Sequence, residues 1–347
     1  MRNSMKLYAS FVSGLDKPVR EILQSAVKGV SIRQTLDGGV IFEGRRILEA
    51  AALPCFQNVF EIIRTEKYRG RAPIEFMMNR LLREPWQCGA QDSRAKRADA
   101  TFRLVTSMEN RLVSVDARRK DALEALIAKK TGLRVERAGA DTEFWLLYRS
   151  EGLVLFMRRL TTHKADRKRA ERGALSPALA HVMNHLSRPT KDDVYLDPFA
   201  GSGALCLSRA GIGACRALYA MDRDKVKAQR LKKAAKTIGE HFKVICGDMT
   251  GMERWIPAGT VTKIVTDPPW GMFAALADPF GFYDKMLSEM IRAAKDGCRA
   301  VVLTAARAEM EKAMGRCKKN IRSVEVYSIL VSGKKAGVYC FEIHPGL

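Results

Sequence analysis

VYLDPFAGSGAL, residues 194–205, is the stretch that decides the fold of this chain. An apolar run ends at Asp197, the glycine turn Gly201-Ser202-Gly203 follows, and a helix is expected from Ala204. Glycines let the backbone approach a ligand closely, and a helix N-terminus offers unpaired N–H groups. The pattern predicts a strand–turn–helix corner that binds a cofactor, with ordinary packing of a helix on a strand as the alternative.

The residues of this turn favour S-adenosylmethionine (SAM) over a dinucleotide. A dinucleotide-binding turn reads GxGxxG, whereas Cys206 stands at the position of the third glycine. An acid before the turn, here Asp197, can accept a hydrogen bond from the ammonium group of SAM.

Three further acids each follow an apolar run. Asp222 comes about 20 residues after the glycine turn, which is the spacing of an acid that binds ribose hydroxyls. Asp248 is placed to accept a hydrogen bond from an adenine amino group, and Asp267 ends the last of the three runs. Because ligands bind at the carboxyl ends of the strands of an open parallel sheet, the four acids are predicted to face one crevice.

The tetrapeptide Asp267-Pro268-Pro269-Trp270 (DPPW) is the second strong motif. Two prolines fix the backbone and remove two N–H donors, so the turn presents acceptors that suit an exocyclic amine. Trp270 offers a flat face on which a planar base could stack, a contact worth about 1–3 kcal/mol. A rigid turn after a strand, with a buried tryptophan, is the alternative.

Together, DPFAGSG, MDRD, CGD and TDPPWG, preceded by RGALSPALAHVMNHL, resemble the class I SAM-dependent methyltransferases that modify amino groups of bases. More narrowly, the chain resembles the THUMP-domain RNA methyltransferases that make N2-methylguanosine. The motifs cover the C-terminal half, and the N-terminal resemblance rests on pattern. The resemblance implies an α/β fold, in which a seven-stranded Rossmann-like SAM methyltransferase domain is preceded by α+β ferredoxin-like and THUMP modules.

The resemblance also implies the roles of individual residues. The target amine would be held by the catalytic residues Asp267, Pro268, Pro269 and Trp270. Two positions depart from the commonest pattern of the family: Ala200 stands where a cysteine is frequent, and Ala204 where a threonine often begins the helix. The implied cofactor-binding residues are Ser176, Asp197, Ala200, Gly201, Gly203, Asp222, Asp248 and Met249.

Composition narrows the class of protein and of partner. The 347 residues suggest two or three domains, and 60 Lys and Arg against 38 Asp and Glu give a formal net charge of +22. This excess favours a polyanionic partner, with nucleic acid ahead of a membrane surface. No stretch approaches the roughly 18 apolar residues of a spanning helix, and the N-terminus lacks a secretory signal.

Cysteine and histidine usage points to a cytoplasmic protein without metal. The eight cysteines contain no CxxC pair and are interpreted as reduced thiols. His181 and His185 share a helix face, but no acid or cysteine flanks them in a ligand-like pattern, which favours packing over metal binding. We expect a monomer.

Four segments are predicted along the chain. Residues 1–65 read β-α-β-β-α-β, the order of a ferredoxin-like unit. Residues 66–160 resemble a THUMP RNA-binding domain. Residues 161–189 form a basic linker and a helix that leads into the SAM pocket, and residues 190–347 form the class I methyltransferase domain.

Basic residues near the THUMP-like segment and the linker are predicted to bind RNA. A charged run is more often a solvated surface, but these residues lie where a substrate would pass between the two modules. The predicted RNA-binding residues are Arg94, Lys96, Arg97, Arg158, Arg159, Lys164, Arg167, Lys168 and Arg169.

These patterns together predict direct methyl transfer from SAM to an exocyclic amine of a flipped base, with guanine N2 in tRNA favoured. A guanine-N2 methyltransferase of 23S rRNA, an adenine-N6 methyltransferase of DNA or RNA, and a non-catalytic RNA-binding scaffold are the alternatives. No helix-turn-helix or zinc-finger pattern supports a DNA substrate. The intact acids and the intact DPPW argue against the scaffold.

Overall fold

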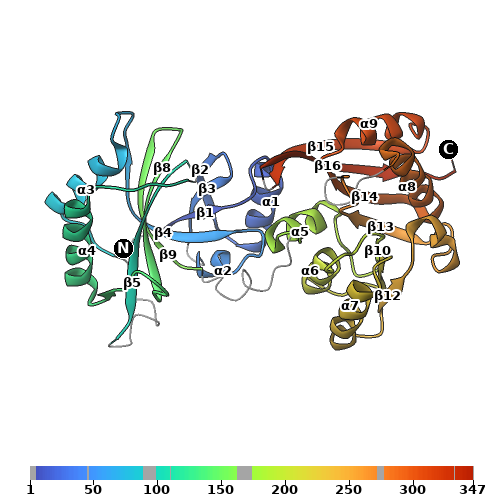
Figure 1. Ribbon diagram of the computed structural model, residues 1–347, viewed down its shortest axis with the longest axis horizontal. Helices are drawn as coiled ribbons and strands as arrows, with labels where there is room; N and C mark the ends of the chain where they lie inside the picture. The colour runs from blue at the N-terminus through green and yellow to red at the C-terminus, as the bar shows by residue number, and fades with distance from the viewer. Residues whose placement is uncertain are drawn as a thin grey trace. The chain divides into compact units, whose positions relative to one another are not determined.

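The computed structural model describes residues 5–44, 47–88, 99–109, 111–161, 174–271, 277–331 and 333–346 (Figure 1). Within these ranges, no helix combines the length and the apolar character needed to cross a membrane. The chain divides into two compact units, Met1–Phe11 with Leu23–Lys164 and Val12–Ile22 with Ala165–Leu347.

The N-terminal unit is built on one nine-stranded sheet with the order β2-β3-β1-β4-β9-β8-β5-β6, and β7 pairs with β5 beside this path. The strands are β1 (Lys6–Ser10), β2 (Ser31–Leu36), β3 (Gly39–Glu43), β4 (Asn58–Lys67), β5 (Thr101–Met108), β6 (Arg111–Leu112), β7 (Arg134–Val135), β8 (Thr142–Arg149) and β9 (Leu153–Arg159).

The first four strands form the part of the sheet that was predicted to be ferredoxin-like. The predicted order β-α-β-β-α-β is confirmed, and all neighbours among β1 to β4 are antiparallel. β4 then pairs antiparallel with β9, so this part and the THUMP-like part share one continuous sheet. The boundary at residue 65 therefore falls within β4, and the division into two modules stays a prediction.

Helices α1 (Asp16–Ala26), α2 (Ile47–Ala51), α3 (Pro73–Arg83) and α4 (Ala117–Thr131) complete this half of the sequence. α4 begins at Ala117, because the Asp116 side chain accepts a hydrogen bond from Arg119 N and caps the helix. Gly132, which follows the last residue of α4, adopts the left-handed conformation and caps the helix C-terminus. α3 and α4 bury apolar side chains against aromatic residues of β5, β8 and β9.

The C-terminal unit contains a seven-stranded sheet with the order β12-β11-β10-β13-β14-β16-β15. Five strands are parallel, and β16 lies antiparallel between β14 and β15, which confirms the predicted seven-stranded methyltransferase sheet. The strands are β10 (Val194–Asp197), β11 (Ala217–Asp222), β12 (Phe242–Cys246), β13 (Val261–Thr266), β14 (Ala294–Thr304), β15 (Ile321–Val331) and β16 (Lys334–Ile343).

Helices flank this sheet and connect its parallel strands. They are α5 (Pro177–Leu186), α6 (Ala204–Ile212), α7 (Lys225–Ile238), the 3₁₀ helix η2 (Met249–Arg254), α8 (Pro279–Ala293) and α9 (Arg307–Arg316). Because β10 lies between β11 and β13 in parallel register, the residues that follow these strands emerge at one edge of the sheet.

Candidate active site

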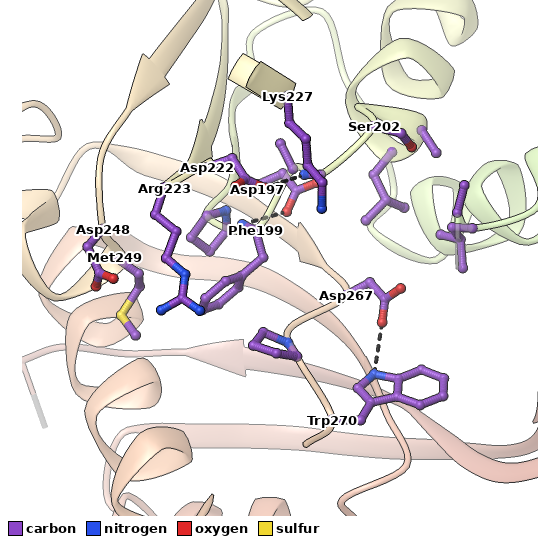
Figure 2. Close-up of a pocket in the computed structure, with 18 of the residues that line it drawn as sticks. Asp197, Phe199, Ser202, Asp222, Arg223, Lys227, Asp248, Met249, Asp267 and Trp270 are labelled. Carbon is purple, nitrogen blue, oxygen red and sulfur yellow. Dashed lines mark hydrogen bonds between the residues drawn. The ribbon is translucent and has the colours of Figure 1, made fainter. Parts of the chain in front are cut away.

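A cleft of about 490 Å³ lies at this edge, at the carboxyl ends of β10, β11, β12 and β13 (Figure 2). Its volume falls within the range of small-molecule sites, about 300–1,000 Å³. Asp248 and Met249 lie at one end of the cleft, and Asp267 and Trp270 lie at the other (Figure 2). The cleft therefore brings the glycine turn, the four acids and the DPPW motif together.

Asp197 is the buried acid of the cleft, with 1% of its surface exposed. Its Oδ1 accepts hydrogen bonds from Thr266 Oγ1 at 2.7 Å and from Phe199 N at 3.1 Å. The pKa of Asp197 is raised to about 7, chiefly by burial and also by the nearby carboxylates of Asp267 and Asp222, against the lowering effect of the two hydrogen bonds. A cationic group placed beside Oδ2 would favour the ionised form.

Asp222 fixes the glycine turn to the next strand. Its Oδ2 accepts from Gly201 N at 2.7 Å, and its Oδ1 accepts from Asp224 N at 2.8 Å. Ala200 N donates to Met221 O at 2.8 Å, which is a second tie between the turn and β11. A carboxylate has about four lone-pair sites, so ribose hydroxyls can still donate to Asp222.

Asp248 and Met249 form the far end of the cleft at the start of η2. Asp248 Oδ1 accepts from the backbone N and the hydroxyl of Thr250, both at 2.9 Å, and so caps η2. Asp248 is exposed, whereas Met249 is 3% exposed. This end combines an acceptor with an apolar surface, which suits a planar heterocycle with an amino group.

Asp267 and Trp270 form the other end. Trp270 Nε1 donates to Asp267 Oδ1 at 2.9 Å (Figure 2). The Asp267 side chain is half-buried, and desolvation raises its pKa to about 7 although the Trp270 hydrogen bond lowers it. A carboxylate with a pKa near neutrality can accept a proton or a hydrogen bond from an amine.

Most of the predicted site residues line this cleft, and three of them do not. Ser176 caps α5 by accepting from Leu179 N at 3.3 Å, while its neighbours Ala174 and Leu175 line the cleft. Gly203 and Pro268 are not among the residues that line the cleft. The predicted residues that do line the cleft are Asp197, Ala200, Gly201, Asp222, Asp248, Met249, Asp267, Pro269 and Trp270.

Gly203 has a structural reason to be glycine. Its φ is 85°, and a Cβ at this position would lie 2.4 Å from Leu231 Cδ1 on α7. The residue therefore permits the close packing of the turn against α7, rather than contact with a ligand in the cleft.

Several other lining residues were assigned no role from the sequence, among them Phe199, Arg223, Lys227 and Phe282. Phe199 packs against Phe282 of α8 with ring centroids 5.6 Å apart, and both line the cleft. Arg223 and Lys227 add two cations beside Asp222. Arg223 could have been predicted to line the cleft, because it directly follows Asp222 in the sequence, whereas Phe282 reaches the cleft only through the tertiary fold.

Two of the predicted RNA-binding residues lie in the described sheet. Arg158 Nη2 is 2.8 Å from Glu61 Oε2, and Arg159 Nη1 is 2.9 Å from Glu143 Oε2. These ion pairs join β9 to its neighbours β4 and β8, and RNA contact by the two arginines stays a prediction. The other predicted residues, Arg94, Lys96, Arg97, Lys164, Arg167, Lys168 and Arg169, lie outside the described residues.

Comparisons with known proteins agree with this geometry. Residues 164–336 match the family model of the RMKL-like methyltransferase domain, UPF0020. A tRNA (guanine(6)-N2)-methyltransferase from Thermus thermophilus is 29% identical over 163 residues, which cover 46% of this chain. The match covers 48% of that relative, so this chain spans about half the length of that curated relative.

Solved structures share the fold over nearly the whole chain. The crystal structure of TrmN from Thermus thermophilus has a TM-score of 0.78 at 21% identity, and covers 98% of this chain and 99% of its own. SMU.472, a protein solved in complex with SAH, has a TM-score of 0.71 at 15% identity and covers 98% of both chains.

Proposed function

Because the chain belongs, through residues 164–336, to the family of RMKL-like methyltransferase domains, we propose that it methylates an exocyclic base amine in RNA with SAM as the methyl donor. Guanine N2 in tRNA is the proposed target. The observation that carries the proposal is the single cleft in which the glycine turn and its acids meet the DPPW motif. The Thermus relative named as a tRNA guanine-N2 methyltransferase supports the choice of target.

The residues of the cleft fit SAM. Asp197 is buried at its centre, and Oδ2 accepts no hydrogen bond from a residue in the described ranges. An ammonium donor at Oδ2 would compensate the cost of ionising this buried carboxyl. Asp222 would bind the ribose hydroxyls, and Asp248 with Met249 would bind the adenine. The residues proposed to bind SAM thus extend along the cleft as far as Asp267.

The proposed reaction is a direct displacement. SAM supplies the methyl group: the amine nitrogen forms a bond to the methyl carbon, and the C–S bond breaks with its electron pair passing to sulfur. Asp267 holds an N–H of the amine through Oδ2 and accepts the proton that the nitrogen loses. Trp270 stacks on the flipped base and offsets part of the unstacking cost of a few kcal/mol. Most of the acceleration comes from positioning the two groups in line.

The N-terminal unit and the basic linker that follows it are proposed to bind the RNA. The formal net charge of +22 supports a polyanionic substrate. The predicted phosphate contacts in residues 94–97 and 164–169, together with Arg158 and Arg159, belong to this proposal. The chain is further proposed to act as a cytoplasmic monomer.

Methyl transfer from radiolabelled SAM to unmodified tRNA and to ribosomal RNA tests the proposal, with nucleoside digestion and mass spectrometry to identify the product. Asp267→Ala runs in parallel. We expect N2-methylguanosine in tRNA from the wild type and roughly a 100-fold lower rate from the variant, as for loss of a group that orients the reacting atoms. If methylated product appeared only in ribosomal RNA, or if the product were N6-methyladenosine, the proposed target would be wrong. SAM binding without transfer to any RNA would favour a scaffold.

A further inference from the structure

The DPPW turn is fixed at its C-terminal end by a chain of buried hydrogen bonds. Tyr283, 0% exposed, lies with its hydroxyl 3.3 Å from Pro269 O and 2.6 Å from Thr304 Oγ1. Thr304 Oγ1 accepts from Ala306 N at 3.0 Å. Burial raises the pKa of Tyr283 to about 12, so the hydroxyl keeps its proton and donates it to the Pro269 carbonyl. The Thr304 hydroxyl then donates to Tyr283.

The backbone of the turn has little remaining freedom. Pro268 and Pro269 fix their own φ angles. Gly271 leaves the turn with φ of 80°, a conformation that favours glycine. What the backbone does not fix is the carboxylate of Asp267, which can still rotate about its two side-chain torsions.

The Trp270 indole N–H removes this last freedom. It donates to Asp267 Oδ1 at 2.9 Å across the turn, from a ring that itself lines the cleft. The hydrogen bond occupies one oxygen of the carboxylate, and Oδ2 accepts no hydrogen bond from the residues that the structure describes. Phenylalanine at this position would keep a stacking ring, but it has no N–H to donate.

We propose that Trp270 is a positioning residue for Asp267: its indole N–H holds Oδ1, so that Oδ2 is presented to the N–H of the target amine. This role is additional to base stacking and rests on the proposed function. It assigns the specific need for tryptophan to its N–H and not only to its ring.

A replacement that separates the N–H from the ring gives the sharpest test. β-(3-Benzothienyl)alanine incorporated at position 270 keeps a bicyclic aromatic ring but has sulfur in place of N–H. Trp270→Phe is the second variant, encoded without an unnatural residue. The pKa of Asp267 is read by ¹³C NMR on protein labelled at the aspartate carboxyls, with its signal identified by loss in Asp267→Asn. kcat for tRNA methylation is measured against pH at saturating SAM.

We expect both variants to raise the pKa of Asp267 by about 1 to 2 pH units, because the ionised carboxylate loses a hydrogen bond. The midpoint of the kcat profile should move to higher pH by the same amount. The plateau of kcat should fall about 10- to 100-fold, as expected for a misoriented reacting group. SAM affinity should stay unchanged, and so should thermal unfolding at about pH 5, where folded Asp267 is protonated in the wild type and in both variants. These two results exclude a folding defect.

A matched control exists in the N-terminal unit, where Trp145 Nε1 donates to Glu143 Oε2 at 2.9 Å. Trp145→Phe removes a similar bond far along the chain from the cleft and should leave the Asp267 pKa and the midpoint of the kcat profile unchanged.

An unchanged Asp267 pKa together with an unchanged kcat in the benzothienyl protein would overturn the proposal. A rise only in the KM for tRNA would also overturn it, because it would reduce Trp270 to a stacking surface. If the wild type methylates no RNA, the proposed function fails, yet the NMR titration still decides whether Trp270 holds the carboxylate.

Discussion

Thr266 Oγ1 donates a 2.7 Å hydrogen bond to Asp197 Oδ1, and Thr266 is the residue immediately before Asp267. Both Thr266 and Asp197 are buried. Because β10 and β13 are neighbouring parallel strands, this bond joins the acid proposed for the cofactor to the strand that carries the acid proposed for the amine. The acid proposed to bind the methyl donor and the acid proposed to bind the target amine are therefore carried by one pair of neighbouring strands.

Thr266→Val should weaken SAM binding about tenfold, the effect of losing one hydrogen bond to a charged group. The valine keeps the side-chain volume but leaves Asp197 with one donor fewer, so ionisation of this buried carboxyl becomes harder. Isothermal titration calorimetry measures the affinity. Thr106→Val, at a buried threonine whose hydroxyl donates to Val113 O in the N-terminal unit, should leave it unchanged. An affinity close to that of the wild type in Thr266→Val would contradict this role.

Asp267→Asn should stabilise the ligand-free protein in a pH-dependent manner. The folded pKa of Asp267 is about 7, above the unfolded value of roughly 3.9. Since folding raises this pKa, the wild type loses stability as pH rises from about 4 to about 7, and the loss is complete above that range. The neutral asparagine avoids it.

We therefore expect the difference in Tm between Asp267→Asn and the wild type to grow between about pH 5 and pH 7 and to level off by about pH 8. Each kcal/mol of added stability should raise the Tm by about 2–4 °C. Differential scanning calorimetry across this range measures it. An advantage that does not vary with pH would show that ionisation of Asp267 is not its cause.

Gly203→Ala should destabilise the C-terminal unit and abolish SAM binding. The new Cβ would meet Leu231 at 2.4 Å, and the φ of 85° disfavours alanine. Gly211 on the same helix is the matched control, because a Cβ there meets nothing within 4 Å and its φ is not positive. Gly211→Ala should stabilise α6 by about 0.5–1 kcal/mol. Thermal unfolding and SAM titration distinguish the two, and a Gly203→Ala protein with normal SAM affinity would be inconsistent with the packing described.

The sequence predicts the part of the site whose chemistry is local. Asp197, the glycine turn and Asp222 are recognisable because a strand, a turn and a helix follow one another along the chain. The parallel-sheet rule then places the acids at one edge. Tyr283 and Phe282 could not be assigned in this way, because α8 reaches the DPPW turn only through the packing of the sheet.

The partners of charged residues could not be predicted from the sequence either. The sequence reveals that Arg158 is basic, but its partner depends on the register of β4 against β9, which places Glu61 opposite it. Likewise, α4 begins at Ala117 because Asp116 caps it, and the strand β6 before it ends at Leu112. Register and capping are properties of neighbours, which periodicity alone does not resolve.

The ion pair of Arg158 with Glu61 offers a test between a structural and an RNA-binding role. Both side chains are buried and lie 2.8 Å apart, so Arg158→Ala should cost about 3–5 kcal/mol of stability by leaving a buried charge unpaired. Arg158→Met combined with Glu61→Leu should recover most of that loss. If Arg158 also neutralises a phosphate, as proposed, the slope of tRNA affinity against salt should be smaller by about 1 in the double variant. An unchanged slope would leave Arg158 with a structural role alone.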